Sequence, residues 1–150
     1  MPLDAIDKSI LNHIQSDFPI EARPYQAIAN DLGLTEIQVL DRVKTLKSIG
    51  IIRRIGGNLV PRKIGFVSTL CAARVPEEKI DAFAEIVNRF PGVTHNYQRD
   101  HEFNVWFTFI ARSRDDIRQS LTRIEEETGV SPILNLPATH VFKIRAEFDV

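Results

Sequence analysis

The sequence is poor in cysteine and has no long apolar run. Cys71 is the only cysteine in 150 residues, which excludes an internal disulfide and a cysteine-clustered zinc or iron–sulfur site. Because Cys71 lies in an apolar run, we expect a small buried side chain there. No apolar run is long enough to span a bilayer, and the first residues lack the basic and apolar regions of a signal peptide. We therefore expect a cytoplasmic protein that does not associate with membranes.

The sequence also lacks an excess of charge of either sign. It has 19 lysine and arginine residues against 20 acidic ones, a net charge of −1, so no overall field attracts nucleic acid. The apolar share of 43% and the charged share of 26% are those of ordinary globular proteins. A chain of this length holds one mid-sized domain or two small ones.

The first third of the chain has apolar residues at helical intervals. One apolar stripe runs through residues 3–14 and predicts a helix. Pro24 begins a second short helix that Gly33 ends, and Thr35 caps a third. Helices joined by a tight turn with glycine form the outline of a helix-turn-helix. Residues 51–60 have a glycine-rich centre between short apolar runs, which predicts a β-hairpin wing.

From residue 66 onward the pattern changes to strands that alternate with helices. The predicted elements are a strand at 66–74, a helix at 77–90, strands at 93–99 and 103–111, a helix at 113–129, a short extended segment at 133–136 and a strand at 140–148. The order βαββαβ is the ferredoxin-like arrangement, in which both helices cover one face of an antiparallel sheet. We therefore predict an α+β protein with a winged helix-turn-helix domain over residues 1–60 and a ferredoxin-like domain over residues 66–150.

Residues 95–108 carry an unusual concentration of polar and aromatic chemistry. This short hairpin-like segment holds two histidines, an arginine, a tyrosine, an asparagine and the only tryptophan. A strand pair that served only the fold would need its apolar residues and little else. Imidazole, guanidinium, amide and indole groups in one hairpin suit a pocket for a large, flat, anionic ligand. The candidate residues are His95, Tyr97, Arg99, His101, Asn104 and Trp106.

Strand parity assigns some of these side chains to a face. In the strand at 103–111 the phenylalanine and valine row must meet the helices, which leaves Asn104 and Trp106 on the open face. In the strand at 140–148 the apolar row likewise leaves Lys143 and Arg145 on the open side. For these two cations alone, a solvated face or a dimer interface is the favoured interpretation. An open sheet face usually finds a partner.

The parity of the strand at 93–99 stays open. One row contains His95 and Arg99, the other contains three polar residues, and neither row is good core material. A β-bulge would place both His95 and the following turn at the rim of a pocket. For the isolated histidines His13 and His140 we favour ordinary structural positions.

The charge of the helix-turn-helix segment leaves two interpretations open, a DNA reader and a module retained for dimerisation. Residues 1–60 carry seven basic and seven acidic residues, so their net charge is zero. Glu36 and Asp41 lie near the start of the recognition helix, where they would repel a polyanion. Four basic residues keep a DNA contact open, namely Arg42, Lys44, Arg53 and Arg54. We expect DNA binding to be weak at best.

The whole chain resembles the Lrp/AsnC family. Residues 3–7 resemble the opening of that family, and residues 50–56 and 61–66 resemble its wing and hinge. Where those regulators have a turn containing glycine between the second and third strands, this chain has residues 99–104. The longer block that contains this turn, residues 95–107, is instead similar to the siroheme decarboxylases. The residues that carry the likeness are His95, Asn96, Tyr97, Arg99, His101, Phe103, Asn104, Trp106 and Phe107. A tyrosine often occupies the place of Phe103 in that family.

The second resemblance implies an enzyme of haem biosynthesis. Siroheme decarboxylases are carboxy-lyases that remove two acetate carboxyl groups from siroheme and give didecarboxysiroheme. Two related subunits commonly form a heterodimer, so a homologous second subunit is the implied partner. No oxidant or organic cofactor is implied, because the conjugated ring of the substrate can be the electron sink. The iron is part of the substrate.

Given that resemblance, each candidate residue receives a hypothetical role. We expect Arg99, Lys143 and Arg145 to bind carboxylates, whereas Tyr97 and Trp106 would supply flat surface for the macrocycle and Asn104 a further substrate contact. His101 would serve as axial ligand to the substrate iron or as proton donor, and His95 as the other proton donor.

Two alternatives to this enzyme remain. One is an Lrp/AsnC-type transcription regulator whose pocket senses an amino acid, another small molecule or haem. The other is a structural subunit whose partner holds the active site. Carbon dioxide release from siroheme separates the first alternative from the enzyme, and activity of the chain with and without its partner separates the second.

Overall fold

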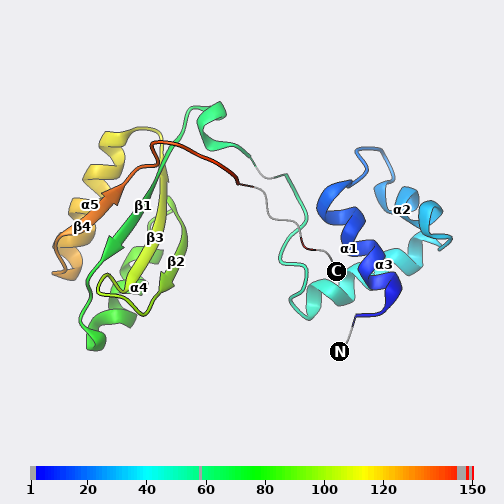
Figure 1. Ribbon diagram of the computed structural model, residues 1–150, viewed down its shortest axis with the longest axis horizontal. Helices are drawn as coiled ribbons and strands as arrows, with labels where there is room; N and C mark the ends of the chain where they lie inside the picture. Colours follow the sequence, from blue (N-terminus) through cyan, green and yellow to red (C-terminus); the bar gives the residue numbers. More distant parts are fainter. Residues whose placement is uncertain (1–2, 58, 145–147, 149) are drawn as a thin grey trace. The chain divides into compact units, whose positions relative to one another are not determined.

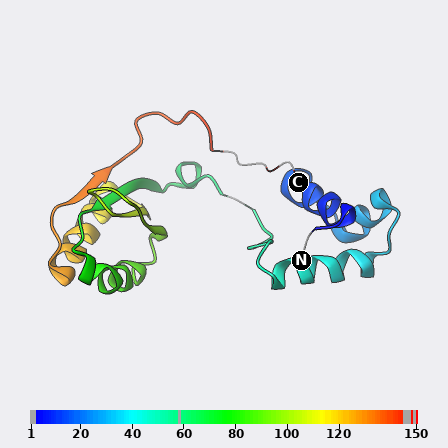
Figure 2. The same ribbon diagram turned by 60° about the horizontal axis from the view of Figure 1, so that its bottom comes forward.

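The computed structural model describes residues 3–57, 59–144, 148 and 150, and it divides into two compact units. One unit combines Met1–Asn58 with Lys143–Val150, and the other is Leu59–Phe142 (Figures 1 and 2). The predicted end of the first domain at residue 60 is close to this division. The C-terminal segment differs from the prediction, because Lys143–Val150 groups with the helical unit instead of the sheet. Among the described helices, none is long and apolar enough to cross a membrane.

The helical unit contains three helices that pack around one apolar core. They are α1 (Ala5–Ser16), α2 (Pro24–Leu32) and α3 (Glu36–Ser48). Capping boxes begin α1 at Asp4 and α3 at Thr35, as expected where a short polar side chain binds free backbone N–H groups. Gly33 ends α2 in the left-handed conformation that glycine adopts at low cost. The core residues are Ile10, Ile28, Ala29, Val39, Val43, Leu46 and Ile52. The predicted helix-turn-helix is confirmed.

The predicted wing is wrong, since no strand forms in the described part of residues 51–60. The N–H groups of Ile51 and Ile52 both bind the carbonyl of Leu46, at 3.0 and 3.1 Å. Ile52 is buried against the helical core. This segment therefore caps the C-terminal end of α3. An isolated two-stranded hairpin in its place would have little stability of its own. A short 3₁₀ helix, η1 (Pro61–Ile64), follows.

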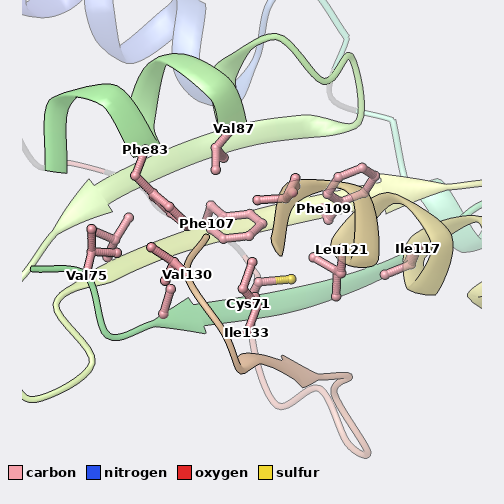
Figure 3. Packing of buried hydrophobic residues seen from close by; sticks show 13 residues of the cluster. Cys71, Val75, Phe83, Val87, Phe107, Phe109, Ile117, Leu121, Val130 and Ile133 are labelled. Carbon is pink, nitrogen blue, oxygen red and sulfur yellow. The ribbon is translucent and has the colours of Figure 1, made fainter. Parts of the chain in front are cut away.

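The second unit has the predicted βαββαβ order. Its elements are β1 (Val67–Ala73), the 3₁₀ turn η2 (Glu77–Lys79), α4 (Ile80–Asn88), β2 (Val93–Gln98), β3 (Val105–Ala111), α5 (Arg114–Thr128) and β4 (Ile133–Leu136). The strands lie in the order β2-β3-β1-β4, and each neighbouring pair is antiparallel. Both helices cover the same face of the sheet, where Phe83 of α4 and Leu121 of α5 meet Phe107 of β3 in one core (Figure 3).

The predicted strand at 140–148 is wrong for its described residues. Residues 140–144 adopt no regular structure, and Phe142 and Ile144 are 92% and 81% exposed instead of forming a core row. The edge position next to β1 belongs to β4, the segment predicted only as short and extended. Since α5 ends at Gly129 and Ile133 is buried in the core, the chain reaches this edge before residue 140. Residues 145–147 lie outside the described part of the chain.

A β-bulge in β2 resolves the parity that the sequence left open. Val93 pairs with Phe109 and His95 pairs with Thr108, so Thr94 is an extra residue on β2. Val93 therefore faces the helices, whereas His95 and Tyr97 face the open side with Trp106. The predicted placement of Trp106 on the open face is confirmed.

Candidate functional site

The turn between β2 and β3, residues 99–104, is closed by its own hydrogen bonds. The N–H of Arg99 donates to the carbonyl of Asn104 at 2.8 Å, and the N–H of His101 donates to the carbonyl of Arg99 at 3.0 Å. The side chain of Asn104 binds both the N–H and the carbonyl of Val75, each at 2.8 Å. This pair of bonds fastens the turn to the residue that follows β1 and Arg74. Asn104, predicted to contact a substrate, thus has its amide occupied by the backbone of Val75.

His101 is held in one orientation by Phe103 and Trp106. Its Nδ1 accepts the N–H of Phe103 at 3.0 Å, so in the neutral ring the proton lies on Nε2. The imidazole stacks on the ring of Phe103 with centroids 6.4 Å apart and meets Trp106 edge-on at 6.5 Å. The indole Nε1–H of Trp106 donates to the carbonyl of Phe103 at 2.6 Å. Phe103 therefore joins the two residues through its backbone.

A depression of about 470 Å³ lies beside this turn and is open to solvent. Its lining residues are Glu77, Ile80, Gln98, Arg99, Asp100, His101 and Asn104. The side chain of Arg99 is exposed and makes no ion pair with any residue in the described part of the chain. An unpaired guanidinium beside an imidazole is a suitable site for a carboxylate.

The open face of the sheet holds the other predicted site residues. The ring of His95 stacks on that of Tyr97 with centroids 6.0 Å apart, and its Nδ1 lies 3.1 Å from the hydroxyl of Thr94. Tyr97 is half exposed and lies opposite Trp106 in the register. The predicted residues thus form two groups, one on the open face and one in the depression. The contact between Trp106 and His101 joins them.

Lys143 and Arg145 were both predicted to project from the open side of the sheet. Lys143 belongs to the helical unit, and no strand forms over residues 140–144, the described part around it. Its predicted projection from the sheet is therefore wrong. Arg145 lies outside the described residues.

Cys71 and the remaining acidic residues offer no further reactive centre in the described structure. Burial raises the pKa of the Cys71 thiol to about 12, so the thiolate does not form near neutral pH. No group of three or more His, Cys, Asp or Glu residues is arranged to hold a metal among the described residues. The buried small side chain expected at Cys71 is confirmed.

One residue next to the site escaped the sequence analysis. Arg74 follows β1, forms an ion pair with Glu102 and places its guanidinium carbon 5.6 Å from the ring centroid of Phe103. The signal available in the sequence was an arginine placed directly after the apolar run of a central strand. That signal does not predict a role by itself, because only the pairing of β1 with β3 brings Arg74 beside the turn.

Two family descriptions match the two units. Residues 7–53 match the siroheme decarboxylase NirDL-like HTH domain, and residues 63–143 match the AsnC-like ligand binding domain. The chain is 54% identical over 146 residues to the siroheme decarboxylase alpha subunit of Desulfovibrio desulfuricans, covering 97% of this chain and 84% of that protein. It is 38% identical over 150 residues to the siroheme decarboxylase NirD subunit of Stutzerimonas stutzeri, covering 100% of this chain and 97% of that protein.

Solved structures show the same likeness. A crystal structure of the siroheme decarboxylase NirDL matches with a TM-score of 0.69 at 32% identity, over 94% of this chain and 46% of that chain. This chain therefore spans about half the length of that protein. A structure of NirDL in co-complex with an iron-uroporphyrin III analogue matches with a TM-score of 0.67 at 30% identity, over 94% of this chain and 48% of that chain. Escherichia coli AsnC shares the fold at 17% identity, with a TM-score of 0.80 over 98% of this chain and 99% of that chain.

Proposed function

The chain belongs to the siroheme decarboxylase family, and we propose that it is a siroheme decarboxylase subunit that removes two acetate carboxyl groups from siroheme to give didecarboxysiroheme. The observation that carries this proposal is the turn between β2 and β3. It combines an unpaired Arg99 with an oriented His101 whose ring meets Trp106. These groups match a substrate that is flat, aromatic and fringed with carboxylates.

The proposed reaction is that of a carboxy-lyase without an oxidant or an organic cofactor. At each acetate the bond between the methylene carbon and the carboxylate carbon breaks, and carbon dioxide leaves. The electron pair of that bond passes into the conjugated macrocycle, and a proton added to the methylene carbon makes a methyl group. The substrate supplies its own iron and its own electron sink, so the protein has to bind the carboxylate and deliver the proton.

Arg99 is the proposed carboxylate ligand. Its guanidinium is exposed at the depression and has no ion-pair partner in the described structure, so binding an acetate displaces no existing ion pair. Glu77 and Asp100 also line the depression and would repel carboxylates that bind elsewhere in it. This arrangement favours one carboxylate position, at the guanidinium of Arg99.

The hydrogen bond from Phe103 favours a donor role for His101. Because Nδ1 is occupied by the N–H of Phe103, the neutral ring presents Nε2–H to its surroundings. An axial iron ligand needs a lone pair on Nε2, which would place the ring proton on Nδ1, against the N–H of Phe103. Ligation by His101 thus requires the turn to change, whereas a hydrogen bond from Nε2–H to a substrate oxygen does not. Its exposed ring can recover protons from solvent.

The open-face residues complete the proposal. Trp106 and Tyr97 offer aromatic surface for the macrocycle, and His95 beside them is the second proton donor. The amide of Asn104 supports the turn through Val75. Lys143 and Arg145 stay predicted carboxylate contacts.

A homologous second subunit is the proposed partner, in a heterodimer. Relatives are named as alpha, NirD and NirG subunits. The depression is open to solvent, and the exposed open face of the sheet carries Leu70 and Leu136, each 42% exposed. A second subunit that covers both the depression and the open face would exclude water from a bound macrocycle, which favours loss of a carboxylate.

The test is turnover of siroheme under anaerobic conditions, by the chain alone and with its homologous subunit. We expect carbon dioxide release and a product lighter by two carboxyl groups, measured by mass spectrometry. Activity only with the second subunit, retained when His101 of this chain is replaced by alanine, would place the active site in the partner. Siroheme binding without carbon dioxide release from either preparation would contradict the proposal and favour a sensor.

The regulator alternative has weaker support from the helical unit. Arg42 of α3 donates to Asp4 and Asp7 at 2.8 and 2.7 Å, and Arg23 pairs with Glu36. Lys44 lies 3.6 Å from Asp41. Two of the four basic residues that keep a DNA contact open, Arg42 and Lys44, thus already have acidic partners.

A further inference from the structure

Arg74 lies outside the depression but touches the turn that forms it. It follows the last residue of β1 and is exposed, as is Glu102, its ion-pair partner in the turn. Its guanidinium carbon is 5.6 Å from the ring centroid of Phe103, within the range of a cation–π contact. Arg74 therefore holds the two residues that directly follow His101.

Phe103 transmits this contact to the imidazole. Its N–H fixes Nδ1 of His101, its ring stacks on the imidazole, and its carbonyl accepts the indole N–H of Trp106. A displacement of Phe103 would change all three contacts together. The central strand β1 is hydrogen-bonded on both sides, to β3 and β4, so it gives Arg74 a rigid base from which to hold the turn.

We propose that Arg74 is a positioning residue for His101. Through Glu102 and Phe103 it keeps the imidazole in the Nε2–H tautomer and directed at the substrate. The expected effect of Arg74 on turnover rests on the proposed function. Its expected effect on the tautomer of the His101 imidazole does not. An exposed ion pair adds little to global stability, so the consequence of losing Arg74 falls on the geometry of the turn.

The chain contains a matched control in Arg123 of α5. Its guanidinium carbon is 5.5 Å from the ring centroid of Phe90, and it pairs with Glu127 at 3.4 Å. Like Arg74, Arg123 combines a cation–π contact with a glutamate ion pair, although its ion pair lies within one helix, and no predicted site residue is part of these contacts. Replacing Arg123 removes the same type of contact away from the site.

The experiment compares Arg74→Gln with Arg123→Gln in the full chain, assayed with the second subunit where turnover requires it. For Arg74→Gln we expect kcat to fall by about 10- to 100-fold with little change in KM, because a small misplacement of a catalytic group costs this much. Arg123→Gln should match the wild type. Arg74→Lys should fall between them, because it keeps the charge but loses the planar contact with Phe103.

Histidine side-chain ¹⁵N spectra provide a readout that does not depend on turnover. The wild type and Arg123→Gln should show His101 as a single Nε2–H tautomer, and Arg74→Gln should show a mixture of tautomers. His101→Gln assigns the signal. If the wild type releases no carbon dioxide, the proposed function fails, yet these spectra still decide whether Arg74 positions the ring.

Three results would overturn the inference. They are an Arg74→Gln variant with wild-type kcat, one with an unchanged tautomer signal, and one whose loss of kcat is matched by Arg123→Gln. Circular dichroism checks the fold of each variant. If Arg74→Gln does not fold, Glu102→Gln removes the ion pair while keeping the cation–π contact, and the absence of any change in its kcat and spectra overturns the inference equally.

Discussion

Two arginines, one in each unit of the protein, use their charge in different ways. In the helical unit, Arg42 is enclosed between Asp4 and Asp7, and Arg23 and Lys44 also have acidic neighbours. In the sheet unit, the turn at 99–104 leaves Arg99 without an ion pair in the described structure and presents Nε2 of His101 outward. The charge of Arg42 thus supports the helical fold through the nearly buried Asp7, whereas the charge of Arg99 is available to a ligand.

The contrast between Arg42 and Arg99 indicates that the helix-turn-helix fold and the proposed activity belong to different units. The helix-turn-helix outline alone would suggest a DNA-binding regulator. The pairing of its charges and the free groups of the turn instead direct attention to the sheet unit.

Replacing His101 with alanine should have the largest effect. We expect kcat for siroheme to fall by about 10²- to 10⁴-fold, the usual contribution of a positioned proton donor. The comparison variant is His140→Gln, since His140 contacts Phe142 and no residue of the turn; it should keep wild-type turnover. Unchanged carbon dioxide release by His101→Ala would remove this residue from the mechanism.

Replacing one arginine in each unit should separate binding from stability. Arg99→Gln should lower kcat/KM for siroheme by about 10- to 100-fold, the range for losing a hydrogen bond to a charged group, with no change in melting temperature. Arg42→Gln should keep kcat/KM but lower the melting temperature, because Asp7 is nearly buried and would lose its partner. The contrast between the units breaks down if the two variants exchange these effects.

DNA binding by the full chain should be weak and nonspecific. Since Arg42 and Lys44 of α3 have acidic partners and residues 1–60 carry no net charge, we expect a dissociation constant of about 10⁻⁴ M or weaker at physiological salt, measured by fluorescence anisotropy with duplex DNA. Asp41→Asn, which frees Lys44, should strengthen binding and steepen its salt dependence. Tight binding to a defined sequence would show that the helical unit is still a DNA reader.

The smallest expected effect is a pH dependence of the stability of the helical unit. A hydrogen bond from the backbone N–H of Asp7, together with Arg42, lowers the pKa of Asp4 below its usual 3.8. The stabilisation by the Asp4 carboxylate is therefore fully present above about pH 4 and is lost as the pH falls through the lowered pKa. The melting temperature of Asp4→Asn should lie below that of the wild type at pH 7, and the difference should shrink towards pH 2. A difference independent of pH would contradict this.

Local patterns predicted most of the elements correctly, because caps and periodicity act over a few residues. Thr35 with Gln38 begins α3 as its capping pattern indicates. The pattern failed at the described residues of 51–60 and 140–148. The N–H groups of Ile51 and Ile52 bind the carbonyl of Leu46 at the end of α3, and β4 already occupies the position beside β1. Thr94 shows the same limit within a correct strand, since its bulge decides which face His95 occupies.

The amino-acid sequence alone determined the two-part architecture, the order of elements in the sheet unit and the position of the chemically unusual hairpin, because spacing and residue type set these locally. Tertiary structure alone decided three further points: which segment pairs with β1 at the edge, which face His95 and Tyr97 occupy, and that Arg74 reaches Phe103. Each depends on contacts between residues far apart in the chain, and those contacts form only when strands pair in a defined register.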